Sequence, residues 1–369
     1  MAKSTTASFV LELRLVTHQN EQAILEKRFA IAERLYNKVL YHAKTQLMEL
    51  RKNRQYQELL RERRLAVQMK DGKQKNSCNS ALQDIQQVFG LSEYALHAYI
   101  GRMRSPYKKH IDSFTAQKIA TTVWKSLSDI LYGKGQKVQF KKFGQLASLE
   151  GKSNATGIRF LGDRVQWNGL ILPVKLRDGD LFAQEVLASH RVKYCRIVRK
   201  SFKNGPKYFV QLVMEGLPPI KRNNDTGLCR RNPSPTAEVG VDIGTSTVAV
   251  SAEKGVILKE LFPEAKGFDN QIRRLQRKLD RSRRATNPTR FNADGTITRG
   301  IRLPWVRSNN YRKIRHQLQD VYRRRAVALK QAHNRTANAI LALGNQIYVE
   351  EMDFRALMKR AKETTVKPN

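Results

Sequence analysis

The spacing of the apolar residues changes twice in the first half of the chain, and this change constrains the fold more than any other feature of the sequence. In the segment 9-FVLELRLV-16, apolar residues recur at period two, which is typical of a half-buried strand. From Glu21 the spacing becomes helical, with Arg and Lys expected on the outside and an apolar stripe formed by Ile24, Phe29, Ala32, Leu35, Val39 and Ala43. We expect further helices around Ser80–Phe89 and Ser113–Tyr132, with the polar segment 71-DGKQKNSCN-79 as an exposed loop between helices.

The second change begins at 133-GKGQKVQFKKFG-144, after which strand patterns dominate to about residue 214. The segment 164-RVQWNGLILPV-174 predicts a hairpin, because Asn168 and Gly169 can take the positive φ angles that a two-residue type I′ turn requires. A second hairpin is predicted to join residues 191–200 to residues 208–215. The first part of the chain therefore predicts a β-barrel or curved sheet, interrupted near its start by a block of helices.

The second half of the chain predicts a separate α/β domain. Residues 216–236 have the Pro, Gly and polar content of a linker. The segment 239-VGVDIGTSTVAVS-251 and the VILKEL that follows it predict three antiparallel strands. Next come a basic helix, 269-DNQIRRLQRKLDRSRR-284, a longer helix from Asn309 to Leu343, and a short strand in 346-QIYVEEMDF-354. This β-β-β-α-β order, with one acid on the first strand and another at the fourth, predicts a ribonuclease-H-like fold.

The charge of the chain predicts a polyanionic partner. The sequence has 69 Lys+Arg against 32 Asp+Glu, a net charge of +37, and nucleic acid is the first candidate. A membrane surface is the second, but the basic residues are spread along the whole chain, and no apolar run approaches the roughly 18 residues of a membrane span. The N-terminus lacks the apolar core of a secretion signal. The three cysteines, Cys78, Cys195 and Cys229, form no CxxC pair and are consistent with reduced thiols, so we expect a cytoplasmic protein.

The strand around Asp242 is compatible with two phosphate chemistries. In one, 242-DIGTS-246 wraps the phosphates of ATP, as in the actin-like ATPases, which also need a second phosphate loop and an adenosine-binding Gly-Gly segment that this chain does not show. In the other, Asp242 holds magnesium against the backbone of a nucleic acid. Residues 271–335 contain 19 Lys+Arg against 3 Asp, which the ATPase hypothesis does not explain and phosphate contact does.

A nuclease of this fold needs two or three carboxylates that converge on divalent cations. Mg²⁺ prefers oxygen ligands, and two ions roughly 3.5–4 Å apart can stabilise both the attacking water and the leaving oxygen of a phosphodiester. Asp242 lies in mid-strand with glycines two residues away on either side, which leaves room for metal and phosphate. Glu350, at the end of QIYVEE, is the natural second ligand, whereas Glu351 is expected on the opposite face of its strand.

The motifs together resemble the TnpB family, RNA-guided nucleases of insertion sequences, and more distantly the miniature type V CRISPR effectors. The resemblance covers nearly the whole chain and lies in 11-LELRLVTHQNEQAILEKRFAIAERLYN-37, 133-GKGQKVQFKK-142, 273-RRLQRKLDRSRR-284, 240-GVDIG-244 and 347-IYVEEMDF-354. It implies an α+β multidomain protein. A wedge-type β-barrel (1–17 and 133–220) with an inserted helical recognition lobe (18–132) would be followed by a linker (221–236) and a RuvC-like nuclease domain (237–369).

The resemblance also implies the site and the partners. The family's first two RuvC acids fall on Asp242 and Glu350, which would be catalytic and bind Mg²⁺, with two ions in a complete site. The partners would be a guide RNA and a target double-stranded DNA with a short adjacent motif, in a prokaryotic cytoplasm near the nucleoid. The residues expected to bind nucleic acid are Lys141, Lys142, Arg273, Arg274, Arg277, Lys278, Arg281, Arg283, Arg284, Arg312, Arg315, Arg323, Arg324 and Arg325.

The sequence departs from the family at its C-terminus. Family members continue past the second acid to a zinc ribbon with paired CxxC motifs and then a third acid, whereas this sequence ends at 361-AKETTVKPN-369. We therefore expect an incomplete RuvC domain here, with Zn²⁺ only in a ribbon that this sequence lacks. The alternatives left open are an RNA-guided DNA-binding repressor without nuclease activity and, from another class, an actin-like ATPase.

A thermal-shift measurement separates the ATPase from the nucleic-acid hypotheses. We expect millimolar ATP with Mg²⁺ to leave the melting temperature unchanged, although a site with a micromolar dissociation constant would contribute roughly 4 kcal/mol at a thousandfold excess of ligand. A shift with ATP and none with RNA would favour the ATPase.

Overall fold

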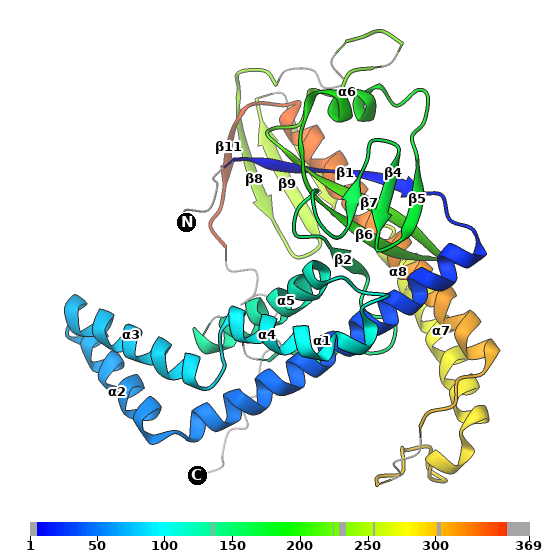
Figure 1. Ribbon diagram of the computed structural model, residues 1–369. Coiled ribbons are helices and arrows are strands. Elements are labelled where there is room, and N and C mark those ends of the chain that lie inside the picture. Colours follow the sequence, from blue (N-terminus) through cyan, green and yellow to red (C-terminus); the bar gives the residue numbers. More distant parts are fainter. Residues whose placement is uncertain are drawn as a thin grey trace, which may run out of the picture. The chain divides into compact units, whose positions relative to one another are not determined.

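The chain divides into two compact units in a computed structural model that describes residues 6–133, 135, 137–223, 225–228, 234–253, 255–300 and 304–352 (Figure 1). The first unit comprises residues 1–200 and 207–220, and the second comprises residues 201–206 and 221–369. Within the predicted linker, residues 224 and 229–233 lie outside the described residues, and so does Cys229.

The first unit contains a curled antiparallel sheet, a half-barrel whose strand order is β2-β6-β7-β1-β5-β4-β3. Leu11 of β1 lies opposite Leu212 of β7, and Leu13 lies opposite Val210, so the inward face of this central pair is apolar and buried. The strands are β1 (Ser8–Leu15), β2 (Ser148–Glu150), β3 (Arg159–Phe160), β4 (Arg164–Trp167), β5 (Leu170–Lys175), β6 (Val192–Phe202) and β7 (Gly205–Glu215). β2 and β3 are the two edges of this order, so the described strands form a curved sheet and no closed barrel.

Both predicted hairpins are present in this sheet. Asn168 and Gly169 have φ angles of 46° and 78°, as the type I′ turn between β4 and β5 requires. β6 and β7 form the second hairpin, with Gly205 at a φ of 115° where β7 begins. One helix in this region, α6 (Leu181–Ser189), falls where strands were expected. Its signal was Asp180, whose carboxylate accepts a hydrogen bond from the backbone nitrogen of Ala183 as an N-cap.

The helical block contains five α-helices: α1 (Gln19–Lys52), α2 (Arg54–Gln68), α3 (Gly72–Val88), α4 (Glu93–Met103) and α5 (Ser113–Leu131), with a short 3₁₀ turn at Ser105–Tyr107. The prediction of an exposed loop at residues 71–79 was wrong, because these residues begin α3. Asp71 caps the helix by accepting hydrogen bonds from the backbone nitrogens of Lys73 and Gln74. Cys78 and Leu82 then start a buried stripe at helical spacing, which the polar composition of the segment conceals.

The prediction that Arg and Lys lie on the outside of α1 was wrong at Arg28, which is only 4% exposed. Its guanidinium donates hydrogen bonds to the carbonyl oxygens of Trp167 (2.7 Å) and Asn168 (2.8 Å) and lies 4.5 Å from the centre of the Trp167 ring. The indole nitrogen of Trp167 in turn donates to Asp112 (2.8 Å), the N-cap of α5. Burial lowers the pKa of Arg28 to about 10, against the opposing effect of the Asp112 charge. This chain of contacts joins α1, the β4–β5 hairpin and α5.

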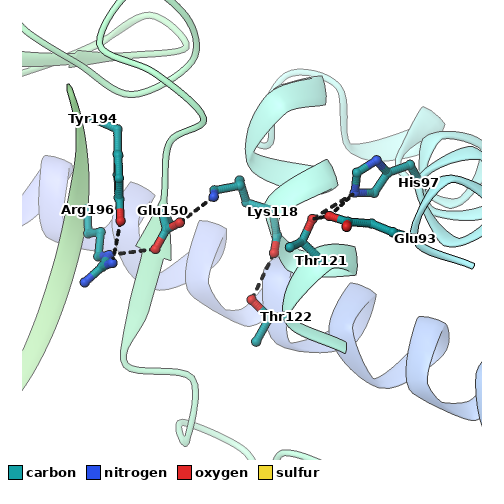
Figure 2. A network of polar contacts seen from close by, with 8 residues as sticks. All are labelled: Glu93, His97, Lys118, Thr121, Thr122, Glu150, Tyr194 and Arg196. Atoms are coloured by element: carbon teal, nitrogen blue, oxygen red, sulfur yellow. Dashed lines mark hydrogen bonds and ion pairs between the residues drawn. The ribbon is translucent and has the colours of Figure 1, made fainter. Parts of the chain in front are cut away.

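A second polar network joins α5 to the other edge of the sheet (Figure 2). Glu150 of β2 accepts from Lys118 of α5 and from Arg196 of β6, both at 2.6 Å, and Arg196 also donates to the Tyr194 hydroxyl at 2.8 Å. Burial acts to raise the pKa of Glu150, but the hydrogen bonds and charges of Lys118 and Arg196 outweigh it, so the pKa lies below its usual value. The ionised carboxylate is therefore the form that the folded unit stabilises.

The second unit contains a four-stranded sheet with the order β10-β9-β8-β11, in which β11 is parallel to β8 and the other neighbours are antiparallel. Val239, Val241, Val248 and Val250 form its buried face, against which Ile340 and Leu343 pack. The elements are β8 (Glu238–Ile243), β9 (Thr247–Ala252), β10 (Gly255–Glu260), α7 (Ala265–Thr286), a 3₁₀ turn at Pro288–Arg290, α8 (Asn309–Leu341) and β11 (Gln346–Val349). The strands and the two helices follow the predicted order, and residues 353 and 354 of the predicted last strand lie outside the described residues.

The Glu150 network predicts a loss of stability in acid. Because the pKa of Glu150 is lower in the folded than in the unfolded chain, its contribution is present above the unfolded pKa of about 4.3 and is lost as the pH falls through the folded value. We expect Glu150→Gln to destabilise the first unit by about 1–3 kcal/mol at neutral pH. This deficit should shrink as the pH is lowered through the folded pKa of Glu150.

Hydrogen–deuterium exchange of the α5 and β6 backbone amides, at several pH values, measures this effect within the first unit. The matched control is Glu49→Gln, which removes a carboxylate paired with Lys52 on the exposed surface of α1 and should cost less than about 0.5 kcal/mol. A Glu150→Gln deficit that is independent of pH would contradict the assignment of an ionised Glu150.

Candidate functional site

Asp242 lies on the open face of the second sheet. It is exposed and pairs with Ala249 of β9, while its neighbour Val241 points into the buried face. Gly240, two residues earlier on the same face, has no atom closer than 3.9 Å to the position that a Cβ would take. At Gly244 a Cβ would lie 3.2 Å from the hydroxyl oxygen of Thr247, so the turn after the strand is tight. The two glycines that flank Asp242 therefore serve different purposes: one leaves open surface, and the other closes the turn.

The parallel pairing of β11 with β8 brings Glu350 to Asp242. Val349, the last residue of β11, is the register partner of Val241. Neighbouring strands lie about 4.8 Å apart, and partners in a parallel pair point to the same face. Both acids are exposed. Asp242 is the next residue of β8, and Glu350 follows directly after β11, so two acids 108 positions apart in the sequence lie at the carboxyl ends of neighbouring parallel strands.

Other acids of this sheet do not join the pair. Glu351 is one position further, beyond the end of β11, and its place on the opposite face stays a prediction. Glu238 is on the same face as Asp242, but four residues away along β8, or about 13 Å, and its carboxylate accepts from the Tyr348 hydroxyl. Within the described ranges, no cluster of three or more His, Cys, Asp or Glu side chains has the arrangement of a metal site. The donors present are two carboxylates, the hard oxygen ligands that Mg²⁺ prefers.

The predicted phosphate-binding residues of this unit lie on a helical hairpin. α7 and α8 pack together through Ile272, Ile314 and Val321, which are buried. Polar contacts support the pairing: the Gln276 amide donates to the Tyr322 hydroxyl at 3.2 Å, and Arg325 lies 3.4 Å from the Asp269 carboxylate. The hairpin therefore holds the basic side chains of both helices on one rigid support.

The basic residues of α7 fall into two groups. Those of the first group are exposed, and none of the described carboxylates pairs with them: Arg273, Arg274, Arg277, Lys278 and Arg281. Arg273, Arg277 and Arg281 are four residues apart and form one row along the helix. Lys278 and Arg281 also line a groove of about 560 Å³ between α7 and α8. This free row has the properties expected of a phosphate-binding surface.

The second group is held by carboxylates and aromatic rings. Asp280 binds Arg283 at 2.7 Å and Arg284 at 2.6 Å. The hydrogen bond from Arg284, joined by one from Arg283, keeps the pKa of Asp280 below its usual value, although burial opposes it. The guanidinium of Arg283 also lies over the rings of Phe291 and Trp305, at 5.5 and 5.4 Å from their centres. These arginines build the end of the hairpin, so their role in phosphate binding remains a prediction.

The arginines of α8 show the same division. Asp320 is buried and binds Arg323 at 2.7 Å and Arg324 at 3.1 Å, and Arg325 pairs with Asp269. Arg312 is exposed, and Arg315 is partly buried. The predicted Lys141 and Lys142 lie in the first unit, where the Lys141 ammonium lies 5.4 Å from the centre of the Tyr36 ring. The fourteen predicted residues are therefore distributed over both units and do not form one cluster within either.

Sequence reasoning missed the groove itself. Besides Lys278 and Arg281, its lining comprises Ser282, Ala285, Asn310, Lys313, Ile314 and Gln317. Lys313, Gln317 and Asn310 recur at three- and four-residue spacing on α8, which was the available signal. The sequence prediction weighed the density of Lys and Arg along each helix, and its residues did not include Lys313 or its polar neighbours.

The chain matches no protein-family model and no curated protein. It is similar in backbone path to a protein in a cryo-EM structure of a Cas12f1–sgRNA–target DNA complex, with 10% sequence identity and a TM-score of 0.43 over 94% of this chain and 81% of that chain. It is also similar to a protein in a cryo-EM structure of a CRISPR-Cas12f ternary complex, with 13% identity and a TM-score of 0.31 over 89% of this chain and 63% of that chain. Among the described helices, none has the length and apolar content needed to cross a bilayer.

The two arginine groups predict different responses to salt. Wild-type affinity for nucleic acid should fall by about 10³ or more between roughly 50 and 200 mM salt if six or more phosphates are neutralised. Replacing Arg273, Arg277 and Arg281 together by Gln removes three free cations. The slope of log K against log salt should then be smaller by about 2–3.

The matched control on the same helix is the pair Arg283→Gln and Arg284→Gln. Because these side chains are engaged by Asp280, Phe291 and Trp305, we expect a lower melting temperature and a nearly unchanged slope. Fluorescence anisotropy with a labelled duplex at four salt concentrations measures both sets. Equal slopes for the wild type and the row variant would contradict phosphate binding by the free row.

Proposed function

We propose that this chain is an RNA-guided DNA endonuclease of the kind that its motifs resemble, which binds a guide RNA and cleaves complementary DNA with a metal-dependent RuvC-type site. The observation that supports the proposal is the parallel register of β8 and β11, in which Val241 pairs with Val349 and the residues that follow are Asp242 and Glu350. The same unit carries the row of free arginines on α7. Adjacent carboxylates and unpaired cations on one compact unit are what cleavage of a polyanion requires.

Asp242 and Glu350 would hold Mg²⁺. When bound, the ion supplies a Lewis acid that stabilises charge on the phosphate and activates a water as the nucleophile. The open face at Gly240 supports this role, because a nucleic-acid backbone needs unobstructed approach to the carboxylates. The tight turn at Gly244 begins two residues after Asp242, where β8 ends, so Asp242 itself lies on regular strand backbone.

Base pairing and the protein surface would have separate roles in recognising the target. Pairing between an RNA guide and a DNA strand reads the sequence, and the protein then needs only a basic surface that follows the backbone of the duplex. The free row Arg273–Arg277–Arg281 and the neighbouring groove would provide contacts of this kind. The family resemblance, and not the geometry, supplies the proposal that the guide is RNA and that the target carries a short adjacent motif.

Asp242→Asn is the decisive variant, since it preserves shape and removes one anionic ligand. Loss of a partner outside the ligand shell of a metal typically costs 10–100-fold, so loss of a direct ligand should reduce cleavage by more than about a hundredfold. Binding of RNA and of the guided target should change less than about twofold, because the basic helices do not depend on Asp242. Cleavage of a fluorescent target duplex in Mg²⁺ and anisotropy of the labelled RNA measure the two effects.

Two exposed acids serve as controls, one on β8 and one shortly after β11. Glu238→Gln and Glu351→Gln each remove one negative charge near the pair without removing a predicted ligand, and both should cleave at close to the wild-type rate. Full activity in Asp242→Asn would overturn the metal site. Guided binding without cleavage by the wild type, in Mg²⁺ and in Mn²⁺, would instead support the RNA-guided repressor.

A further inference from the structure

Residues 137–147, here called the strap, lie across α1 and are held there by buried polar contacts. Asn37 and the backbone of Lys141 exchange two hydrogen bonds, each 2.8 Å long. Glu33, which is only 7% exposed, accepts hydrogen bonds from the backbone nitrogens of Gln145 (3.0 Å) and Leu146 (3.3 Å). Side chains of α1 thus fix the strap backbone at two places, around Lys141 and at Gln145–Leu146.

The strap presents aromatic rings to solvent. Phe140 is 44% exposed, and its ring centre lies 5.0 Å from the Lys44 ammonium. Phe143 is 59% exposed and sits in a turn that closes from Gln145 to Lys142, with Gly144 at a φ of 76°. Tyr41, 68% exposed, lies on α1 between Asn37 and Lys44 at helical spacing. Three large, exposed rings therefore lie on the strap and on the part of α1 whose Asn37 and Lys44 contact the strap.

The charged side chains in the segments that carry these rings are all positive. Residues 130–149 contain four lysines and no acid, and residues 34–48 of α1 contain Arg34, Lys38 and Lys44 and no acid. None of the described carboxylates pairs with Lys44, Lys141 or Lys142, and the nearby Glu33 is buried and satisfied by the strap backbone. The exposed surface thus combines apolar ring faces with uncompensated cations.

We propose that Tyr41, Phe140 and Phe143 form a stacking platform for unpaired bases of a single-stranded nucleic acid, with Lys44, Lys141 and Lys142 at its phosphates. Exposed aromatic rings interleaved with lysines are the arrangement with which proteins bind single strands without reading their sequence. A duplex does not suit this surface, because its bases are already stacked and its backbone offers no ring face. The proposal rests on the proposed nucleic-acid function but is independent of cleavage at Asp242.

The double variant Phe140→Ala, Phe143→Ala tests the platform. Stacking on an aromatic side chain typically changes single-strand affinity by about 5- to 150-fold per base, so we expect the variant to bind a labelled 12-nucleotide oligouridylate at least about tenfold more weakly. No charge is removed, so the salt dependence should remain that of the wild type. Affinity for a blunt RNA duplex should change less than about twofold.

Three further measurements make the test specific. Phe140→Trp should retain the affinity, since it keeps a stacking ring. Tyr94→Ala removes a ring that is 84% exposed on α4, and should bind like the wild type. A strand that carries 2-aminopurine should lose fluorescence on binding to the wild type and not on binding to the double variant. Parallel titrations with oligouridylate and oligothymidylate show whether RNA or DNA is the preferred strand.

The outcomes separate this proposal from the proposed function. If the double variant binds single strands as tightly as the wild type, the platform is wrong while duplex binding and cleavage stand. If the double variant changes only the oligomeric state of the protein, measured by sedimentation, the surface is a protein–protein contact and the platform is again wrong. If the wild type binds neither single strands nor duplexes, the platform and the proposed function fail together.

Discussion

The buried guanidinium of Arg28 is the contact on which the first unit depends. It joins α1 to the carbonyl oxygens of Trp167 and Asn168, 139 and 140 residues further along the chain. The indole nitrogen of Trp167 in turn donates a hydrogen bond to Asp112. Burying a cation is costly, and here two backbone carbonyls, an aromatic face and the charge of Asp112 compensate in part, while the Arg28 Nε has no hydrogen-bond partner among the described residues. The position of Asp112 also restricts residue 157. A Cβ at Gly157 would lie 2.8 Å from the Asp112 carboxylate, so only glycine leaves room for this carboxylate.

α1 contacts several strands and loops of this unit, and different polar side chains along the helix make these contacts. Arg28 fixes the β4–β5 hairpin, and Glu26 binds Arg199 of β6 at 2.8 Å and accepts from the Tyr208 hydroxyl of β7. Glu33 and Asn37 hold the strap. Polar side chains at different positions along α1 thus bind different strands or loops of the first unit. The buried apolar residues of α1 contribute to the core. The exposed rings of the strap can remain in solvent because the polar contacts, not the rings, hold it in place.

Sequence reasoning succeeded where a local rule decides the structure. Asn168-Gly169 predicted its turn because few residues tolerate positive φ, and the alternation in β1 predicted a strand with one buried face. It failed where a distant partner decides. Arg28 has the local pattern of a surface residue, and only the approach of Trp167 makes it a buried one. In α3, the cap at Asp71 was visible in the sequence, but the polar residues after it outweighed the short stripe that Cys78 begins.

The candidate site shows the same limit more sharply. The sequence predicted one acid in mid-strand and a second at a strand end, but whether the two meet depends on the register of β11 against β8, and a slip of one residue would turn Glu350 to the other face of the sheet. Arginine density likewise predicted a basic hairpin without separating free cations from paired ones. The separation follows from where the few acids lie: Asp280 and Asp320 each bind the arginines three and four residues ahead, so Arg283, Arg284, Arg323 and Arg324 are paired with carboxylates. Arg273, Arg277 and Arg281 have no acid three or four residues before them that engages them, and their charge is what remains to act on another molecule.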